Sequence, residues 1–256
     1  MRQIGPIVMV DKSLGQNWLK NRAILDEIAE LADNGEAKLC VEIGPGLGTL
    51  TSSLLRHFEK VIAVEFDEKL AGNLPKSFPG KNLEVVNGDI LKYDFESLDE
   101  PYVVAGNIPY YITSPIIKKV LEVVNRPARV VLLMQKEVAE RITDEKETVL
   151  SLFVKNHAKV FAGPVVSKEE FTPMPKVDSQ VVVMEPFEKP VVDEEVFELI
   201  RKGFSAPRKK LVHNLVGLKS KDKLVEAFHE CGILEDARPG DVSLKEWGKL
   251  YQLVMQ

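Results

Sequence analysis

This chain of 256 residues has few cysteines, few aromatic residues and no long hydrophobic run. Two cysteines, Cys40 and Cys231, cannot form a disulfide framework, so we expect a reducing compartment and a cytoplasmic protein. Neither has a second cysteine or a histidine at metal-ligand spacing, so the sequence predicts no metal site. Apolar runs such as Val130–Met134 are far shorter than the ~18 residues of a membrane span, and Asp11 and Lys12 interrupt any signal peptide.

Net positive charge is also lacking. The formal net charge is −5, which is not typical of a protein that binds nucleic acid through its overall charge. The charge is uneven, however, because residues 198–225 hold eight basic and two acidic residues. Such a stripe can bind phosphates in an acidic protein, but from charge alone a solvated helix face is the better interpretation.

What is present is an ordinary globular composition, with 45% hydrophobic and 29% charged residues. The length suggests one large domain, or one large and one small domain. Short apolar runs alternate with segments of helical spacing, which predicts an α/β fold with a parallel sheet and helices on both faces. The expected strands are 38–43, 60–64, 83–86, 102–105 and 129–134, and the expected helices are 23–32, 49–58 and 116–124.

The pattern changes in the last third of the chain. Residues 149–161 fit either a helix or a strand, and residues 180–184 fit a strand. Pro186 and Pro190 then precede a segment that is helical to the end, with candidates at 196–204, 209–216, 221–231 and 244–254. We therefore expect a first domain at 1–186 and a small all-helical domain at 187–256.

A glycine-rich loop follows the first predicted strand of the sheet. Gly44, Gly46 and Gly48 lie between that strand and a helix, where glycine permits a tight turn and a close approach to a bound group. The spacing differs from the dinucleotide pattern GxGxxG, and alone it could be a structural turn.

Acidic residues follow the next two strands. Glu65 ends the second strand, 21 residues after Gly44, where an acid can accept hydrogen bonds from ribose hydroxyls. Asp89 follows the third strand, where a carboxylate can accept from an adenine amino group. Each acid alone could simply cap a loop or helix. In this order, the loop and the two acids fit S-adenosylmethionine better than NAD.

The fourth strand leads into Asn107-Ile108-Pro109-Tyr110. The amino group of adenine is a poor nucleophile, and two rigid acceptors aimed at its protons would favour a more tetrahedral nitrogen. Asn107 can offer its side-chain oxygen and Ile108 its carbonyl oxygen, Pro109 stiffens the turn, and Tyr110 can stack on the base. An ordinary turn with buried tyrosines is the structural alternative.

A second aromatic candidate lies downstream. Phe171 precedes Thr172-Pro173-Met174-Pro175, and this stiff loop could hold the ring against the other face of a flipped base. Taken alone, Phe171 would be a core residue beside a proline turn.

Together these segments resemble the ribosomal RNA adenine N6,N6-dimethyltransferase family of the KsgA type. The similar segments occur in family order between residues 12 and 215. They are KSLGQNWL at 12–19, VEIGPGLGTLT at 41–51, VIAVEFD at 61–67, NGDIL at 87–91, GNIPYYITSPI at 106–116, LMQKEVAERI at 133–142, EFTPMPKVDSQVVV at 170–183 and FSAPRKKLVHNL at 204–215.

The resemblance implies a Rossmann-like class I methyltransferase domain followed by a small helical domain. It implies transfer of methyl groups from S-adenosylmethionine to N6 of two adjacent adenosines near the 3′ end of small-subunit rRNA. The expected partner is an immature small ribosomal subunit, and the expected state is a monomer. The implied cofactor contacts are Gln16, Asn17, Leu19, Gly44, Gly46, Glu65, Asp89, Ile90 and Asn107; the implied target-base contacts are Asn107, Ile108, Pro109, Tyr110 and Phe171; and the implied RNA contacts are Arg201, Arg208, Lys209 and Lys210.

The chain departs from the family pattern at three places. Trp18 replaces the usual phenylalanine, which we interpret as a neutral aromatic exchange. Residues 144–151 are shortened and lack the Tyr-Gly pair of the family, which affects the expectation for rRNA contacts but not for the cofactor. Only Arg2 and Lys12 are basic before the first motif.

Three alternatives remain open from the sequence. An Erm-type dimethyltransferase, which modifies large-subunit rRNA and confers macrolide resistance, shares QN, the glycine loop and NIPY. The segments LGQNWL, MPKVDSQ and PRKKL favour the KsgA type. A non-catalytic assembly or transcription factor could use the same fold, although the intact NIPY segment argues against it. A nicotinamide oxidoreductase would leave that segment unexplained.

Overall fold

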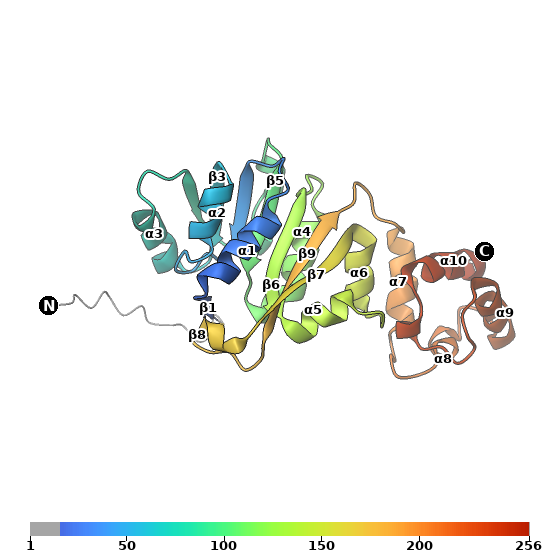
Figure 1. Cartoon of the computed structure of the whole chain (residues 1–256). Helices are drawn as coiled ribbons and strands as arrows, with labels where there is room; N and C mark the ends of the chain where they lie inside the picture. Colours follow the sequence, from blue (N-terminus) through green and yellow to red (C-terminus); the bar gives the residue numbers. More distant parts are fainter. Residues whose placement is uncertain (1–15, 256) are drawn as a thin grey trace. The chain divides into compact units, whose positions relative to one another are not determined.

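The computed structural model describes residues 16–255 (Figure 1). The first residues of the predicted cofactor-closing segment, 12–15, lie outside this range. The chain folds into two compact units. The first contains the residues up to Lys136 together with Gly163–Val183, and the second contains Glu137–Ala162 and the chain from Met184 onward.

This division differs from a single boundary at residue 186, because residues 137–162 belong with the C-terminal helices. Helix α6 (Val149–His157) contacts α10 (Leu244–Met255), and the Phe153 ring meets the Phe197 ring edge-on at 6.2 Å. Residues 137–162 therefore leave the first unit and form part of the second, before the chain returns to the first unit. The order of motifs along the sequence does not indicate this.

The first unit is built on a parallel sheet. Five strands pair in parallel in the order β4-β3-β2-β5-β6, and β9 and β7 continue the sheet beyond β6. These strands are β2 (Leu39–Ile43), β3 (Lys60–Glu65), β4 (Leu83–Asn87), β5 (Tyr102–Asn107), β6 (Arg129–Gln135), β7 (Ala158–Val166) and β9 (Ser179–Pro186). Every residue of β2 is buried, as expected for a strand covered on both faces. The predicted α/β class is confirmed.

The strand order reverses between β2 and β5. From β2 the chain proceeds outward to β3 and β4, and then returns to the other side of β2 as β5. In the register, Ile43 faces Val64 on one side and Gly106 on the other, so the carboxyl ends of these strands meet at one edge. Such a switch point leaves a crevice where ligands bind in open α/β sheets.

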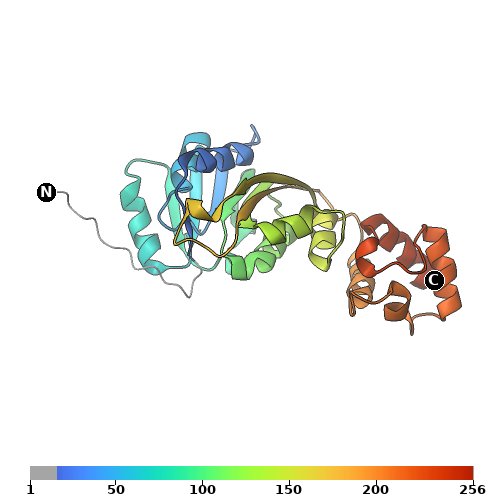
Figure 2. The ribbon, with the colours of Figure 1, turned by 60° about the horizontal axis from the view of Figure 1, so that its bottom comes forward.

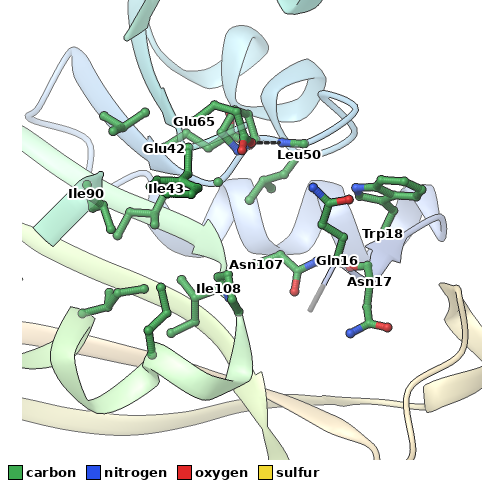
Figure 3. A pocket seen from close by; sticks show the side chains of 18 of the residues that line it. Gln16, Asn17, Trp18, Glu42, Ile43, Leu50, Glu65, Ile90, Asn107 and Ile108 are labelled. Atoms are coloured by element: carbon green, nitrogen blue, oxygen red, sulfur yellow. Dashed lines mark hydrogen bonds between the residues drawn. The ribbon is translucent and has the colours of Figure 1, made fainter. Parts of the chain in front are cut away.

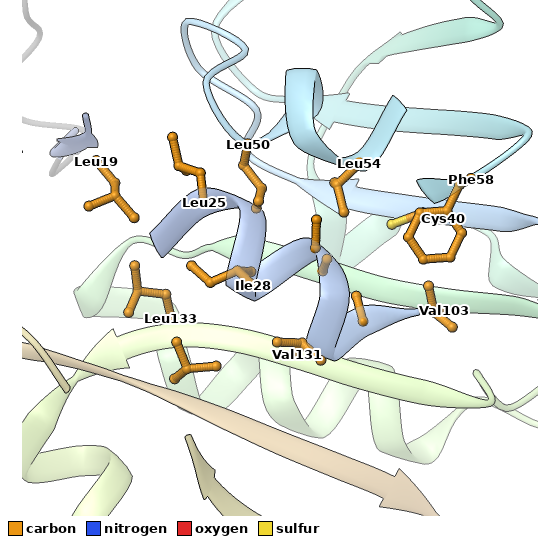
Figure 4. Packing of buried hydrophobic residues seen from close by; sticks show 14 of the residues in the cluster. Leu19, Leu25, Ile28, Cys40, Leu50, Leu54, Phe58, Val103, Val131 and Leu133 are labelled. Atoms are coloured by element: carbon orange, nitrogen blue, oxygen red, sulfur yellow. The ribbon is translucent and has the colours of Figure 1, made fainter. Parts of the chain in front are cut away.

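Apolar helices fix this sheet. Asn21 caps helix α1 (Arg22–Ala32), because its side chain accepts hydrogen bonds from two backbone amides. Helix α1 packs with α2 (Thr51–His57) against the sheet (Figure 4). Figure 4 shows Leu25 and Ile28 of α1 in one apolar cluster with Val131 and Leu133 of β6. In Figure 2, α1 (dark blue) lies on one side of the sheet, and α4 (Thr113–Glu122, green) lies on the other.

Several elements differ from the sequence-based expectation. Residues 149–161 are both helix and strand, because α6 ends at His157 and β7 begins at Ala158. Helices α3 (Glu68–Ser77) and α5 (Lys136–Thr143) were not among those expected from apolar spacing. Polar residues dominate α3, but Asp67 caps its start by accepting hydrogen bonds from two backbone amides. Two short strands, β1 (Trp18–Leu19) and β8 (Phe171–Thr172), pair antiparallel.

The second unit is helical around a buried tryptophan. Trp247 of α10 is fully buried, and a Cβ on Gly203 would clash with its ring. The remaining helices are α7 (Glu194–Gly203), α8 (Leu211–Leu215) and α9 (Lys221–Cys231). Across residues 16–255, no helix has the length and apolar character needed to cross a membrane.

Candidate active site

A cavity of about 300 Å³ opens at the switch point between β2 and β5 (Figure 3). It is lined by the ends of β2, β3 and β5, by the loop after β4, and by the segment before α1. The predicted residues that line it are Gln16, Asn17, Leu19, Gly44, Gly46, Glu65, Asp89, Ile90, Asn107, Ile108, Pro109 and Tyr110. The structure therefore brings together residues that are scattered over the sequence.

The glycine loop gives the cavity its room. Gly44 and Gly46 have φ of +62° and +57°, a conformation that residues with a Cβ disfavour. A Cβ on Gly44 would meet no atom within 4 Å, whereas one on Gly46 would lie 2.8 Å from Nε1 of Trp18. The loop thus leaves open space at its first glycine, and at its second it lies directly against Trp18.

Glu65 holds this loop from the end of β3. Its Oε2 accepts a hydrogen bond from the Gly46 amide at 3.0 Å, and its Oε1 accepts from the Asp67 amide at 2.9 Å. Burial raises the pKa of Glu65, although the amide donors of Asp67 and Gly46 partly offset this effect. The carboxylate oxygens can still accept further donors, so hydroxyl groups of a ligand fit here.

Asp89 combines the two roles that its sequence position allows. Its Oδ1 accepts from the Leu91 amide at 3.0 Å and so caps a 3₁₀ turn, η2 (Ile90–Lys92). The same residue lines the cavity, as does the buried Ile90. Capping fixes one carboxylate oxygen and thereby orients the side chain of Asp89 at the cavity wall.

Asn107 is oriented by one hydrogen bond. Its Nδ2 donates to the backbone oxygen of Asn17 at 2.8 Å, which joins the end of β5 to the segment before α1. Because the amide nitrogen is used in this way, Oδ1 is directed away from Asn17 as the acceptor edge of the amide. The close-up shows Asn107 and Ile108 across the cavity from Glu42 and Glu65 (Figure 3).

The turn after Asn107 is held at several points. The Ile108 amide donates to the Leu133 oxygen of β6 at 3.2 Å, and its side chain is buried. Tyr110 begins the 3₁₀ turn η4 (Tyr110–Ile112), and its hydroxyl lies 2.8 Å from Oγ of Ser179. Burial raises the pKa of Tyr110, so the phenol is neutral at physiological pH. This site has a rigid acceptor beside a positioned aromatic ring.

Comparison with known proteins identifies the family. The ribosomal RNA adenine dimethylase family matches residues 9–256. The chain belongs to the ribosomal RNA adenine dimethylase family. A relative from Clostridium acetobutylicum, named ribosomal RNA small subunit methyltransferase A, is 37% identical over 93% of this chain and 91% of its own length. One of the same name from Nostoc is 37% identical over 95% and 97%. The chain is thus an enzyme, an rRNA adenine methyltransferase.

Solved structures agree with this assignment. A dimethyladenosine transferase from Plasmodium falciparum superposes with a TM-score of 0.78 at 29% identity, covering 91% of this chain and 96% of that one. The 23S rRNA methyltransferase ErmE superposes with a TM-score of 0.79 at 26% identity, covering 93% and 100%. The two share one Rossmann-like methyltransferase fold with this dimethylase, so the fold does not separate their substrates.

One predicted residue of the dimethylase site lies elsewhere in the structure. Phe171 is 2% exposed, belongs to the apolar cluster under α1, and is not among the residues lining the cavity. It is the register partner of Leu19 in the β1–β8 pair. Phe171 therefore has the core position that the sequence offered as its structural alternative. This position differs from the predicted one, in which the ring lies against a target base.

The four predicted RNA contacts lie in the second unit. Arg208, Lys209 and Lys210 are exposed in the loop before α8, and no ion pair involves them within the described part of the chain. Arg201 of α7 forms an ion pair with Glu194 at 2.6 Å. Asn214 braces this loop, because its Nδ2 donates to the backbone oxygens of Gly203 and Ala206.

The cavity also has residues that the sequence analysis did not single out. Glu42 of β2 is buried, and its Oε2 accepts from the Thr51 hydroxyl at 2.6 Å. Burial is the main cause that raises the pKa of Glu42 to about 8. The hydrogen bond from Thr51 lowers this pKa, and the nearby charge of Glu65 raises it further. Phe66 and Tyr111 line the rim and are largely exposed. The sequence did contain a signal for Glu42, because it is the one acidic residue in an otherwise apolar strand.

No metal centre is formed by the described residues. Within residues 16–255 there is no group of three or more histidine, cysteine, aspartate or glutamate side chains that could hold a metal ion.

Proposed function

We propose that this enzyme transfers methyl groups from S-adenosylmethionine to N6 of two adjacent adenosines near the 3′ end of small-subunit rRNA. The products are N6,N6-dimethyladenosines. The proposed partner is an immature small ribosomal subunit, and the proposed state is a monomer. The small-subunit substrate is supported by the names of the curated relatives, which are similar over nearly the whole chain.

The observation that carries this proposal is the orientation of Asn107. Its amide nitrogen is occupied by the Asn17 carbonyl, so its oxygen is the edge available to a ligand in the cavity. An amide oxygen accepts hydrogen bonds, and an adenine amino group donates two. The proposed target group and the oriented side chain therefore have complementary hydrogen-bonding character.

The residues present fit S-adenosylmethionine. Gly44 faces open space within a cavity of about 300 Å³, and Glu65 provides carboxylate oxygens suited to ribose hydroxyls. Asp89 and Ile90 would hold the adenine, and Gln16, Asn17 and Leu19 would cover the site. When bound, the cofactor supplies an electrophilic methyl group on its sulfonium.

The chain's own residues would prepare the attacking amine. Asn107 and the Ile108 carbonyl would accept from the two amino protons, which favours a tetrahedral nitrogen with its lone pair available. Both groups are held by backbone hydrogen bonds before substrate binds, so little reorganisation is needed. Pro109 stiffens the turn, and Tyr110 would stack on the base. The amine becomes cationic on methylation, so no strong base is required for it to lose its proton.

The proposal is tested by incubating labelled S-adenosylmethionine with immature small subunits that lack these methyl groups, followed by nucleoside analysis. We expect mono- and dimethyladenosine from small subunits and none from naked large-subunit rRNA. Methylation of large-subunit rRNA instead would support the Erm-type alternative. Label in neither substrate would contradict both.

Asn107→Ala should lower turnover by about 100-fold or more, because it removes an acceptor used in the transition state. Binding of S-adenosylmethionine, measured by calorimetry, should stay within a few-fold of the wild-type value. Asn82→Ala is a matched control, because its Nδ2 also donates to a backbone oxygen, that of Glu59, but it precedes the amino end of β4 and does not line the cavity. Full activity in Asn107→Ala would refute the acceptor role.

A further inference from the structure

The segment MPKVDSQ at 174–180 has no role in the function proposed above, yet its Ser179 contacts Tyr110, which lines the cavity. Its Asp178 is fixed at both the backbone and the side chain. The Asp178 backbone oxygen accepts from the Lys136 amide at 3.0 Å, and Oδ1 accepts from the Lys168 amide at 3.0 Å. The next residue, Ser179, is therefore held firmly at the start of β9.

Ser179 directs its hydroxyl to the tip of Tyr110. The serine is 0% exposed, and its Oγ lies 2.8 Å from the Tyr110 hydroxyl. The two residues are 69 positions apart and belong to different elements of the first unit. A phenol half-buried at this place needs a partner, because an unsatisfied buried hydroxyl is costly.

This contact restricts the Tyr110 ring. The near end of the residue is fixed by η4, where the Tyr110 backbone oxygen accepts from the Thr113 hydroxyl at 3.1 Å. The far end is fixed by Ser179, so rotation of the side chain about the Cα–Cβ bond would move the hydroxyl away and break a hydrogen bond. A ring that stacks on a base must lie at a fixed place beside that base, and fixing both ends of the tyrosine fixes the long axis of its ring at one place.

We propose that Ser179 is a positioning residue for methyl transfer, which holds the Tyr110 ring at the place where it stacks on the target adenine. This inference rests on the proposed function, because it assumes a purine base at the cavity. It assigns a role to the serine of the MPKVDSQ segment that does not involve contact with cofactor or substrate.

The test is a double-mutant cycle with Ser179→Ala and Tyr110→Phe, measured as kcat for methylation of immature small subunits. Each single variant should lower kcat about tenfold, because each removes the same hydrogen bond. The double variant should be no slower than Tyr110→Phe alone. S-adenosylmethionine affinity should stay at the wild-type value in all three, since neither hydroxyl is assigned to the cofactor.

Ser53→Ala is the matched control. Ser53 is also fully buried, and its Oγ donates to Asp26 at 2.7 Å, away from Tyr110. It should lower thermal stability without changing kcat in either the wild-type or the Tyr110→Phe background.

Two results would overturn the inference. One is an unchanged kcat in Ser179→Ala, and the other is the same fold-loss in the Tyr110→Phe background as in wild type. If Ser179→Ala does not fold, the Tyr110→Phe variant tests the inference by itself. A kcat equal to wild type in Tyr110→Phe would then overturn the inference. Failure of the proposed function is distinct, because the wild-type enzyme would then not methylate small subunits at all.

Discussion

At Asn107, one hydrogen bond decides which end of the side-chain amide is available in the cavity. The donor end is bound to Asn17, so the acceptor end is left for substrate. Further along the same edge of the sheet, two buried acids follow the same logic. Glu65 is held by backbone amides, and Glu42 by the Thr51 hydroxyl. These contacts prepare hydrogen-bonding groups before any ligand is present.

Glu42 predicts a pH-dependent stability. Its pKa in the folded state is about 8 against an ordinary value of 4.5, so between these values the folded protein binds more protons than the unfolded one. The free energy of unfolding should therefore fall as pH rises from 4.5 to 8. Glu42→Gln keeps an acceptor for Thr51 and cannot ionise. We expect a higher Tm than wild type about half a pH unit above that pKa and a smaller gain well below it, in thermal melts without ligand. Equal pH dependence in both proteins would refute this.

Gly44 predicts a selective loss of cofactor binding. Gly44→Ala places a methyl group in open space at the cavity, with no protein atom within 4 Å. Gly35→Ala is matched, because Gly35 also has positive φ and also meets no atom, but it does not line the cavity. Both variants should lose about 1–2 kcal/mol of stability from backbone strain.

Only Gly44→Ala should weaken S-adenosylmethionine binding, by about tenfold or more, since a well-packed ligand does not tolerate an added methyl group. Calorimetric titration measures this. Equal affinity in the two variants would show that Gly44 does not contact the cofactor.

At the scale of elements, the loop between α7 and α8 presents Arg208, Lys209 and Lys210 to solvent. Asn214 fixes the start of this loop by donating to the backbone oxygens of Gly203, the last residue of α7, and of Ala206. Arg201 differs from the other three predicted contacts because Glu194 neutralises it locally. The loop residues are therefore better candidates for phosphate contacts than Arg201.

Arg208→Ala with Lys209→Ala should weaken rRNA binding and reduce its salt dependence. Each lost phosphate contact lowers the slope of log K against log salt by about 0.7–0.9. The double variant should lose roughly 1.5 from the slope if both residues contact phosphate. Lys81→Ala, an exposed lysine just before β4, serves as the control and should leave the slope unchanged. An unchanged slope in the double variant would show that Arg208 and Lys209 do not contact phosphates and belong to an ordinary solvated surface.

The strands were predictable from the sequence because buried parallel strands are short apolar runs bounded by turn residues. The five parallel strands were expected within one or two residues of their ends. Helix α3 was not expected from the sequence, because its stability comes from the Asp67 cap and from three buried residues rather than from a long apolar face. The change from α6 to β7 at residue 158 was also not predictable, because no glycine or proline marks the junction between the two elements.

At the scale of the whole molecule, the site arises from topology. Residues from the ends of three strands and from a segment before α1 converge at the strand-order reversal. The sequence predicted the residues at the strand ends because they follow strands in a recognisable pattern, whereas those before α1 were implied by the family resemblance. For Phe171 the resemblance favoured a position against the target base over the core alternative, since burial of this residue depends on the pairing of β8 with β1, which lies far away in the sequence. The sequence did not predict the return of residues 137–162 to the second unit.

We assign the cavity at this switch point to the methyl donor, with the Asn107 oxygen beside it. A crystal structure with S-adenosylmethionine measures this most directly. We predict the cofactor in the cavity, its ribose on Glu65, its adenine beside Asp89 and Ile90, and the Asn107 oxygen facing the methyl group. A cavity without the cofactor at saturating concentration, or an Asn107 side chain turned into the core, would contradict the account.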